Sequence, residues 1–411
     1  MAVKKRTIDA EIKAPIACAR NLRELCWTGC SPQHRATSWQ ILLNYLPTNS
    51  LKRSGTVKRK RAEYIEFANA ASQGTGVASY YEACTNLAEG SVNAKESYMS
   101  YPVDTFDNRF IARQVHLDVK RVCPEILLFR HPKIQACLMR ALYCYAMRNP
   151  GVSYVQGFHD LISPFVAVFL QALCLPTFEL EDLINASKLD IWRLIDSITD
   201  QELECVEADA FWCLSQFLSC WHDHHTEDQL GVQRMLLHLE SLTQLSNPEV
   251  HSHFESLGVE YHHFGFRWMS CLLVREIPFL SVVRMWDTLL SEPAQDLEKF
   301  FVCVCAGVID LYSHDLIKMQ KFEEVLLFLQ NMPTQNFKEI DVATILSQAF
   351  VFRAIILPMA PTPSLPPCDV CDTSISDCSV DENQQILVQT KRDDVDSWGT
   401  SSVLLFLFDH W

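Results

Sequence analysis

Apolar side chains recur every three or four residues along much of this chain, which is the spacing of a helix with one buried face. One such face carries four apolar residues of a run that ends near residue 148, namely Ile134, Leu138, Leu142 and Tyr145. A second stripe contains Leu297, Phe301, Val304, Val308 and Leu311. Asn149-Pro150-Gly151 follows the first run and predicts the end of that helix.

Similar patterns predict helices at 208–221, 229–245, 261–275, 297–312, 320–331 and 341–357. Glycine, with only 12 residues, is too scarce to supply the many turns of an all-β fold. The predicted fold class is therefore all-α.

Two stretches lack this period. Residues 72–109 are rich in Gly, Ser, Ala and Asn and are expected to form a long surface loop insertion. The prolines between Pro358 and Pro367 end the helical part, and a polar, acidic stretch follows them. We expect residues 358–411 to be a disordered tail and residues 1–28 to be a short basic N-terminal segment.

Composition adds a charge asymmetry. The chain has 411 residues, 48% of them hydrophobic, and can bury a large core. Residues 1–62 contain 13 Lys and Arg against 3 Asp and Glu, so the net charge of −15 divides into +10 there and −25 elsewhere. The basic region is either a solvated face or a peripheral contact with an anionic membrane or an acidic partner. No nucleic-acid partner is expected.

The cellular compartment follows from what the sequence lacks. The first 13 residues contain charges and no apolar core of a signal peptide, which predicts a cytoplasmic protein. The most apolar passage, 161–175, is shorter than the ~20 residues of a membrane span, so no transmembrane helix is predicted. Seventeen cysteines in such a chain are expected to be reduced thiols.

Two short motifs suggest chemistry. VHLDVKR at 115–121 and YVQGFHD at 154–160 place Arg121 and Gln156 35 residues apart, each in a loop beside a predicted helix. A guanidinium can neutralise charge that builds on a phosphoryl group, and an amide can orient a water molecule. A GTPase needs both to hydrolyse its nucleotide. Taken alone, however, such residues are more often surface or capping residues.

Five motifs occur in order along the chain: GCSPQHRATSW (29–39), VHLDVKR, YVQGFHDL, FRWMSCLLVREIP (266–278) and VVRMWDTLLSEP (282–293). Together they resemble the TBC domain of Rab GTPase-activating proteins, most of all the family-member-22 branch and its yeast Golgi relatives. The resemblance covers about residues 29–357. It implies a V-shaped, all-helical domain of two lobes, about 29–200 and 201–357, whose groove receives a GTP-bound Rab.

The resemblance also assigns roles to residues. It implies that Arg121 is an arginine finger and Gln156 a glutamine finger, both supplied in trans, with Asp118, Tyr154 and Gly157 in supporting roles. GTP and Mg²⁺ would be carried by the partner GTPase, so the chain needs no cofactor of its own.

Other residues that match the family motifs are expected to stabilise the fold. The resemblance implies a structural role for Arg35, Trp39, Trp286 and Asp287. Two positions depart from the family pattern, because Val115 replaces the usual Ile and His159 stands where Asn is common. The second leaves open how the Gln156 loop is positioned and whether activity is altered.

No metal site is expected, because Cys368, Cys371 and Cys378 lack a fourth ligand at a suitable spacing. Gly74-Thr75-Gly76 lacks the Lys of a phosphate loop, so the chain itself should not bind nucleotide.

The leading hypothesis is a Rab GTPase-activating protein of vesicle trafficking, cytoplasmic and peripheral at Golgi membranes. One alternative is a non-catalytic Rab-binding scaffold. Another is a helical adaptor held by anionic lipid through Lys52, Arg53 and the basic residues at 58–61.

Overall fold

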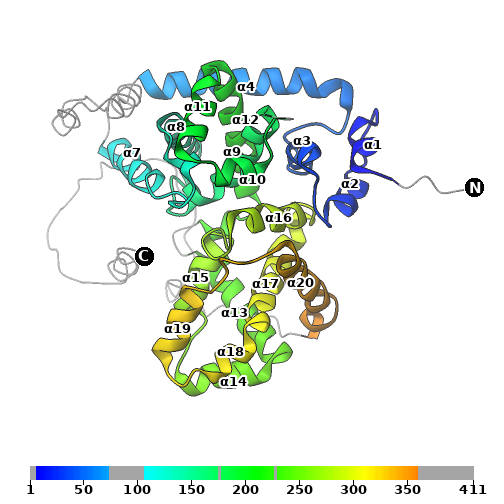
Figure 1. The fold of residues 1–411 in the computed structure, drawn as a ribbon, viewed down its shortest axis with the longest axis vertical. Coiled ribbons are helices and arrows are strands. Elements are labelled where there is room, and N and C mark those ends of the chain that lie inside the picture. Colours follow the sequence, from blue (N-terminus) through cyan, green and yellow to red (C-terminus); the bar gives the residue numbers. More distant parts are fainter. Residues whose placement is uncertain (1–5, 74–105, 175–176, 226–228, 360–411) are drawn as a thin grey trace, which may run out of the picture. The chain divides into compact units, whose positions relative to one another are not determined.

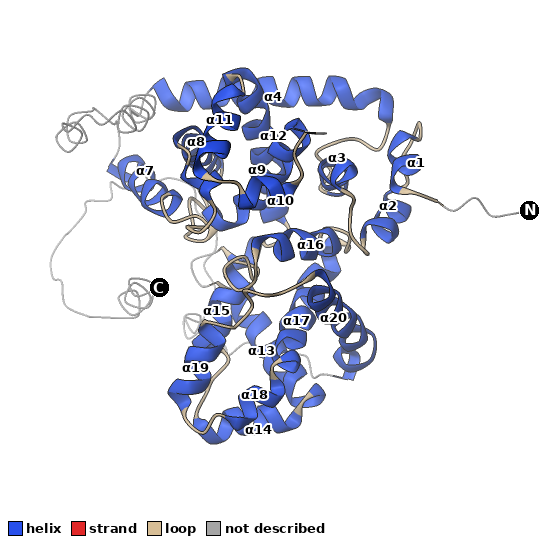
Figure 2. Cartoon of the chain, viewed as in Figure 1, coloured by secondary structure: helices blue, strands red, loops and turns tan. Residues whose placement is uncertain are grey.

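The computed structural model describes residues 6–73, 106–174, 177–225 and 229–359. Within these ranges the chain is helical, without a strand (Figure 2). One isolated β-bridge in the described residues joins Ile16 and Asn49. The all-α prediction is confirmed. Of the predicted insertion, residues 72–73 and 106–109 are helical and 74–105 lie outside the described residues, as does the predicted tail from residue 360 onward.

The first group of helices surrounds one buried helix, α9 (Phe158–Cys174), which packs against α3, α8 and α12 (Figure 1). All side chains from Phe158 to Gln171 are buried, so the most apolar passage of the sequence is a core helix. The other members are α1 (Ile8–Lys13), α2 (Ala19–Cys26), α3 (Pro32–Leu42), α4 (Ser50–Gln73), α7 (Phe106–Val119), α8 (Pro132–Arg148), α10 (Leu180–Asn185), α11 (Lys188–Ser197) and α12 (Asp200–Ser219).

The second group is organised around α17, which packs against α13 and α20. Its members are α13 (Leu230–Ser246), α14 (Pro248–Leu257), α15 (His262–Ser270), α16 (Phe279–Leu289), α17 (Ala294–Leu311), α18 (Ser313–Lys318), α19 (Phe322–Gln330) and α20 (Glu339–Val351). The predicted lobes divide at residue 200, at the start of α12, but α12 itself packs against α4, α8 and α9 of the first group.

Helix α8 begins and ends where its sequence dictates. Pro132 occupies its first turn, where the missing N–H costs nothing, and the His131 side chain accepts a hydrogen bond from the backbone N–H of Lys133. The helix ends at Arg148, as Asn149-Pro150-Gly151 predicts. The loop that carries Gln156 therefore starts from a fixed point.

The predicted helix at 261–275 is wrong at its C-terminal end. Helix α15 stops at Ser270 because Leu272 and Leu273 adopt φ angles of 47° and 60°, in the left-handed region that ends a right-handed helix. Arg275 consequently lies in a turn between α15 and α16 instead of on a helix.

The N-terminal residues contribute to the core. Helices α1 and α2 pack against each other and against α3, and Leu22 and Cys26 of α2 are fully buried. Next to them, the indole Nε1 of Trp27 donates a hydrogen bond of 2.8 Å to Glu292. The segment 1–28 is therefore connected to residues near the other end of the domain.

Part of the predicted basic face is used inside the molecule. Arg53 donates to the backbone carbonyls of Ile12, Pro47 and Thr48, and Arg61 forms an ion pair of 2.7 Å with the buried Asp209. Lys60 lies over the ring of Trp212, 3.7 Å from its centre. Lys52, Lys58 and Arg59 stay exposed on α4.

One described helical stretch, Glu339–Met359, is long and apolar enough to cross a membrane by length and composition. It consists of α20 and a π-helical turn at Phe352–Ile356 followed by a short 3₁₀ turn. Helix α20 packs against α16 and α17, and its buried residues are Val342, Ile345, Leu346 and Ala349. Other apolar residues of the stretch are exposed, among them Ile340, Phe350 and Ile355.

Candidate functional site

Arg121 lies in the turn directly after α7, with 38% of its side chain exposed. Its Nη2 donates a hydrogen bond of 2.6 Å to Oδ1 of Asp118, which is fully buried near the end of α7. In the described part of the chain, Nη1 and Nε of Arg121 make no hydrogen bond. The guanidinium is thus held through Nη2, and its Nη1 is available to donate to a ligand, whereas Nε is buried.

Asp118 has further donors. The hydroxyl of Tyr154 donates to its Oδ2 at 2.8 Å, and Nε2 of Gln114 lies 3.3 Å from both carboxylate oxygens. A buried carboxylate has lost its hydrogen bonds to water, and here donors from two separate segments replace them. Burial, together with the neighbouring Asp118 carboxylate, raises the pKa of Tyr154 well above its usual value, so the hydroxyl keeps its proton.

The turn that carries Gln156 joins α8 to α9. Gln156 is half-buried and directly precedes Gly157, whose φ of 108° is rarely adopted by residues with a side chain. A Cβ atom added at Gly157 would lie 3.4 Å from Sγ of Cys271. The carbonyl of Gly157 accepts the backbone N–H groups of Asp160 and Leu161 and so begins α9.

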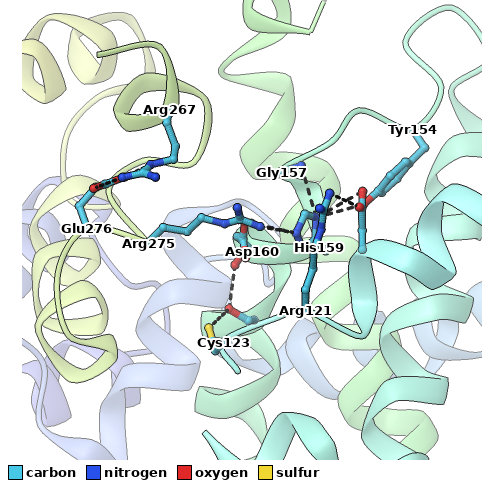
Figure 3. A network of polar contacts seen from close by, with 11 residues as sticks. Arg121, Cys123, Tyr154, Gly157, His159, Asp160, Arg267, Arg275 and Glu276 are labelled. Carbon is cyan, nitrogen blue, oxygen red and sulfur yellow. Dashed lines mark hydrogen bonds and ion pairs between the residues drawn. The ribbon is translucent and has the colours of Figure 1, made fainter. Parts of the chain in front are cut away.

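The structure therefore joins the two predicted finger segments. The chain of contacts runs from Arg121 to Asp118 and on to Tyr154, which lies two residues before Gln156 (Figure 3). No described hydrogen bond involves the side chain of Gln156 itself. The catalytic roles of Arg121 and Gln156 stay predictions.

Three more residues belong to this network. Nε of Arg275 donates to Oδ2 of Asp160 at 2.6 Å, and its Nη2 lies 2.9 Å from Nε2 of His159 (Figure 3). His159 and Asp160 are buried at the start of α9. Sequence reasoning noted His159 only as a departure and assigned Arg275 to a helix, although both occur in the motifs that carry the resemblance.

The turn at 271–276 is fixed on its other side as well. Glu276, next to Arg275, forms a two-fold contact with Arg267 of α15, with Nη2 to Oε2 at 2.8 Å. Burial raises the pKa of the Glu276 carboxyl, and the Arg267 guanidinium opposes that shift. The unusual backbone at Leu272 and Leu273 is thereby held so that Arg275 can reach α9.

The four residues expected to be structural lie together. Asp287 of α16 is fully buried and accepts hydrogen bonds from Nε1 of Trp39 at 2.8 Å, from Nε and Nη2 of Arg35 at 3.1 Å, and from the backbone N–H of Cys30 at 2.8 Å. The rings of Trp39 and Trp286 are 6.2 Å apart. These contacts hold α3 to α16.

One described cluster has the composition of a metal site. Ligand atoms of Glu260, His262 and His263 all lie within 4.8 Å of one another, but Glu260 and His262 are exposed and already contact each other, with Nδ1 of His262 3.1 Å from Oε2 of Glu260. The cluster is at the start of α15 and takes no part in the network around Arg121.

A family model of the Rab-GTPase-TBC domain matches residues 32–317. The chain belongs to this family. The match includes Arg121, Gln156, His159 and Arg275, as well as the contacts between α3 and α16, so the network described above lies inside the TBC domain.

Individual relatives of this TBC chain agree with the assignment. It is 36% identical over 344 residues to GTPase-activating protein gyp1 of Schizosaccharomyces pombe, covering 84% of the chain and 60% of that protein. It is 33% identical to TBC1 domain family member 22A of Mus musculus over 82% of the chain and 58% of that protein. The chain thus spans about 60% of the length of these curated relatives.

A solved structure extends the similarity to three dimensions. The crystal structure of the Ypt/Rab-GAP domain of Gyp1p superposes with a TM-score of 0.70 and 32% identity, covering 84% of this chain and 96% of that one. The predicted TBC fold is therefore confirmed.

Proposed function

We propose that this chain is a GTPase-activating protein that binds a GTP-bound Rab and accelerates its GTP hydrolysis by supplying Arg121 and Gln156 in trans. The Rab carries the GTP and the Mg²⁺. Membership of the Rab-GTPase-TBC family and similarity to proteins named GTPase-activating protein support the proposal. The observation that carries it is the contact chain from Arg121 through Asp118 to Tyr154.

Arg121 is suited to its part by the way it is held. The buried Asp118 binds Nη2 from one side, which fixes the guanidinium before a partner arrives. A charge that is already oriented needs no reorganisation when negative charge builds on the phosphoryl oxygens, and such a group stabilises the transition state more than the ground state.

Gln156 is suited to its part by chemistry and by position. Its amide can accept a hydrogen bond from water and donate one to a phosphoryl oxygen at the same time. It lies in a turn fixed by Gly157 on one side and by the Tyr154 hydroxyl on the other. In this proposal Gln156 orients the attacking water while Arg121 neutralises the phosphoryl group.

The test is single-turnover GTP hydrolysis by a panel of GTP-loaded Rabs, with the native chain, Arg121→Ala and Gln156→Ala. An arginine supplied in trans accelerates hydrolysis by about 10³- to 10⁵-fold in small GTPases, so Arg121→Ala should lose most of the acceleration of any Rab that responds. Arg113→Ala is the matched control, because Arg113 is an exposed arginine on α7, the helix that precedes Arg121. It should leave the rate unchanged.

Binding of each Rab, measured in parallel, separates the proposal from a scaffold. A chain that binds a GTP-loaded Rab but accelerates none, or whose Arg121→Ala variant is as active as the native chain, is a Rab-binding scaffold and not an activator. The Golgi location and the role in vesicle trafficking rest on the resemblance, and the cytoplasmic location rests on the N-terminal sequence; all three stay predictions.

A further inference from the structure

His159 is a fully buried histidine at the meeting point of three segments. It lies near the start of α9, and its ring contacts Tyr154 of the Gln156 turn and Arg275 of the turn at 271–276 (Figure 3). Its Nδ1 is 3.1 Å from the Tyr154 hydroxyl and 3.7 Å from Oδ2 of Asp118. The ring therefore lies between Arg275 and the carboxylate that holds Arg121.

The contact with Arg275, the shortest that the ring makes, decides which ring nitrogen carries the proton. Nη2 of Arg275 is always a donor, so Nε2 of His159, 2.9 Å away, must accept. The proton of the neutral ring is then on Nδ1 and is donated to the Tyr154 oxygen, whose own hydrogen goes to Asp118. The backbone N–H of Gly157, 3.3 Å from Nδ1, makes a longer contact that this tautomer does not accept.

The result is a directed series of hydrogen bonds. Arg275 donates to His159, His159 to Tyr154, and Tyr154 to Asp118, whose other oxygen accepts from Arg121. His159 and Tyr154, in the middle of the series, each accept one hydrogen bond and donate another. Removing the ring from the middle leaves Arg275 and Tyr154 without these partners.

We propose that His159, neutral and protonated on Nδ1, is a positioning residue that links Arg275 to the carboxylate holding the Arg121 finger. The inference rests on the proposed function of Arg121. A protonated ring would direct a second N–H at Arg275 and break the series at its first bond, so GTPase activation should weaken in acid.

Burial favours the neutral ring, and charged groups of both signs surround it. Asp118 and Arg121 face it from α7 and the turn after it, Asp160 from its own helix, and Arg275 from the turn at 271–276. Burial lowers the pKa of His159 below its usual value of about 6.5, the two carboxylates oppose that shift, and the two guanidinium groups reinforce it.

Two variants separate positioning from mere packing. His159→Asn keeps one acceptor and one donor and cannot titrate in this range, whereas His159→Leu keeps neither. At pH 7.5, His159→Leu should lower kcat for the responding Rab by about 10- to 100-fold with little change in KM, the size expected when a catalytic group is displaced. His159→Asn should restore most of that kcat.

The coupling to Arg121 has its own measurement. Because His159 acts through the Asp118 carboxylate, adding His159→Leu to Arg121→Ala should lower the remaining rate much less than it lowers the native rate. Below pH 6.5 the native chain should lose kcat more steeply than His159→Asn. Equal effects of His159→Leu in both backgrounds, or identical pH profiles of the native chain and His159→Asn, would overturn the proposal.

The protonation of the His159 ring can be measured without any Rab, so this test does not depend on the proposed function. NMR of the histidine ring nitrogens, with His159 assigned from the signal lost in His159→Asn, should show an Nδ1–H tautomer at pH 7. A ring protonated on Nε2, or charged at pH 7, would refute the inference even if Arg121→Ala still abolishes activation. Conversely, a chain that activates no Rab refutes the proposed function while the NMR result stands.

Thermal unfolding gives a second Rab-free measurement. Since the pKa of folded His159 is lower than that of the unfolded chain, the unfolded chain takes up the proton first. The contribution of the neutral His159 ring to the free energy of unfolding is then fully present above about pH 6.5 and is lost as the pH falls below that value. The native chain should therefore lose more stability than His159→Asn between about pH 7 and pH 5, and equal losses would contradict a neutral buried ring.

Discussion

Replacing Asp287 by alanine tests whether the contacts between α3 and α16 hold the domain together. Its carboxylate is fully buried and accepts from Arg35, from the indole of Trp39 and from the backbone of Cys30. After Asp287→Ala these donors lose a common acceptor. The Arg35 side chain, only 12% exposed, would keep a charge without a counter-charge.

The expected loss follows from that burial. Removing one partner of a buried ion pair costs about 3 to 5 kcal/mol in the free energy of unfolding, because the remaining charge stays poorly solvated. The unpaired N–H groups of Trp39 and Cys30 would each cost about 1 to 3 kcal/mol alone, but these costs overlap with the first. A loss of about 3 to 5 kcal/mol corresponds to a fall in Tm of about 4 to 7 °C for a domain of this size.

Urea denaturation followed by tryptophan fluorescence and circular dichroism measures this loss. Asp315→Ala is the matched control, since Asp315 is an exposed aspartate 3.7 Å from Lys318, and it should change stability by less than about 0.5 kcal/mol. Adding Arg35→Met to Asp287→Ala should recover part of the loss by removing the unpaired charge. If Asp287→Ala lowers the free energy of unfolding no more than Asp315→Ala does, the Asp287 carboxylate does not hold α3 to α16.

Two further substitutions test the Gln156 turn and the basic helix. Gly157→Ala places a side chain at a φ of 108° and should lower the free energy of unfolding by about 1 to 3 kcal/mol. It should also lower kcat for the responding Rab, and unchanged urea curves and hydrolysis rates would contradict this. Arg61→Gln should lower the free energy of unfolding by about 2 kcal/mol, because it removes the ion pair of the buried Asp209. Lys58→Gln, at an exposed position of the same helix, should lower it by less than about 0.5 kcal/mol. If the exposed basic residues of α4 bind lipid, Lys58→Gln should weaken sedimentation with phosphatidylserine vesicles at low salt, and equal sedimentation of native chain and variant would exclude that role for Lys58.

Local chemistry made some features predictable from the sequence. The end of α8 could be predicted because Asn149-Pro150-Gly151 is a strong helix breaker. Helix α17 could be predicted from its apolar stripe, of which Leu297, Phe301, Val304 and Val308 are buried and Leu311 is 38% exposed. The ion pair between Asp118 and Arg121 is likewise a local contact, because the two residues are three positions apart.

Features that depend on tertiary contacts were not predictable. Helix α4 was missed because much of its length is polar, with only a few residues such as Tyr64 and Ala68 reaching the core. The position of Arg275 depends on two leucines with left-handed backbones, which leucine rarely adopts. Nothing local to the sequence indicates that His159 is buried between Arg275 and Tyr154.

The partnership of Arg35 with Asp287 has a consequence during synthesis. The two residues are 252 positions apart, so the ribosome must add most of the domain before Arg35 meets its counter-charge. At typical rates of about 5 to 20 residues per second, that interval lasts about 13 to 50 s. During that time α3 cannot reach its final packing, and the nascent chain exposes apolar surface that chaperones can bind. We therefore expect chains truncated before Asp287 to aggregate in the cell, whereas chains ending after α20 stay in solution.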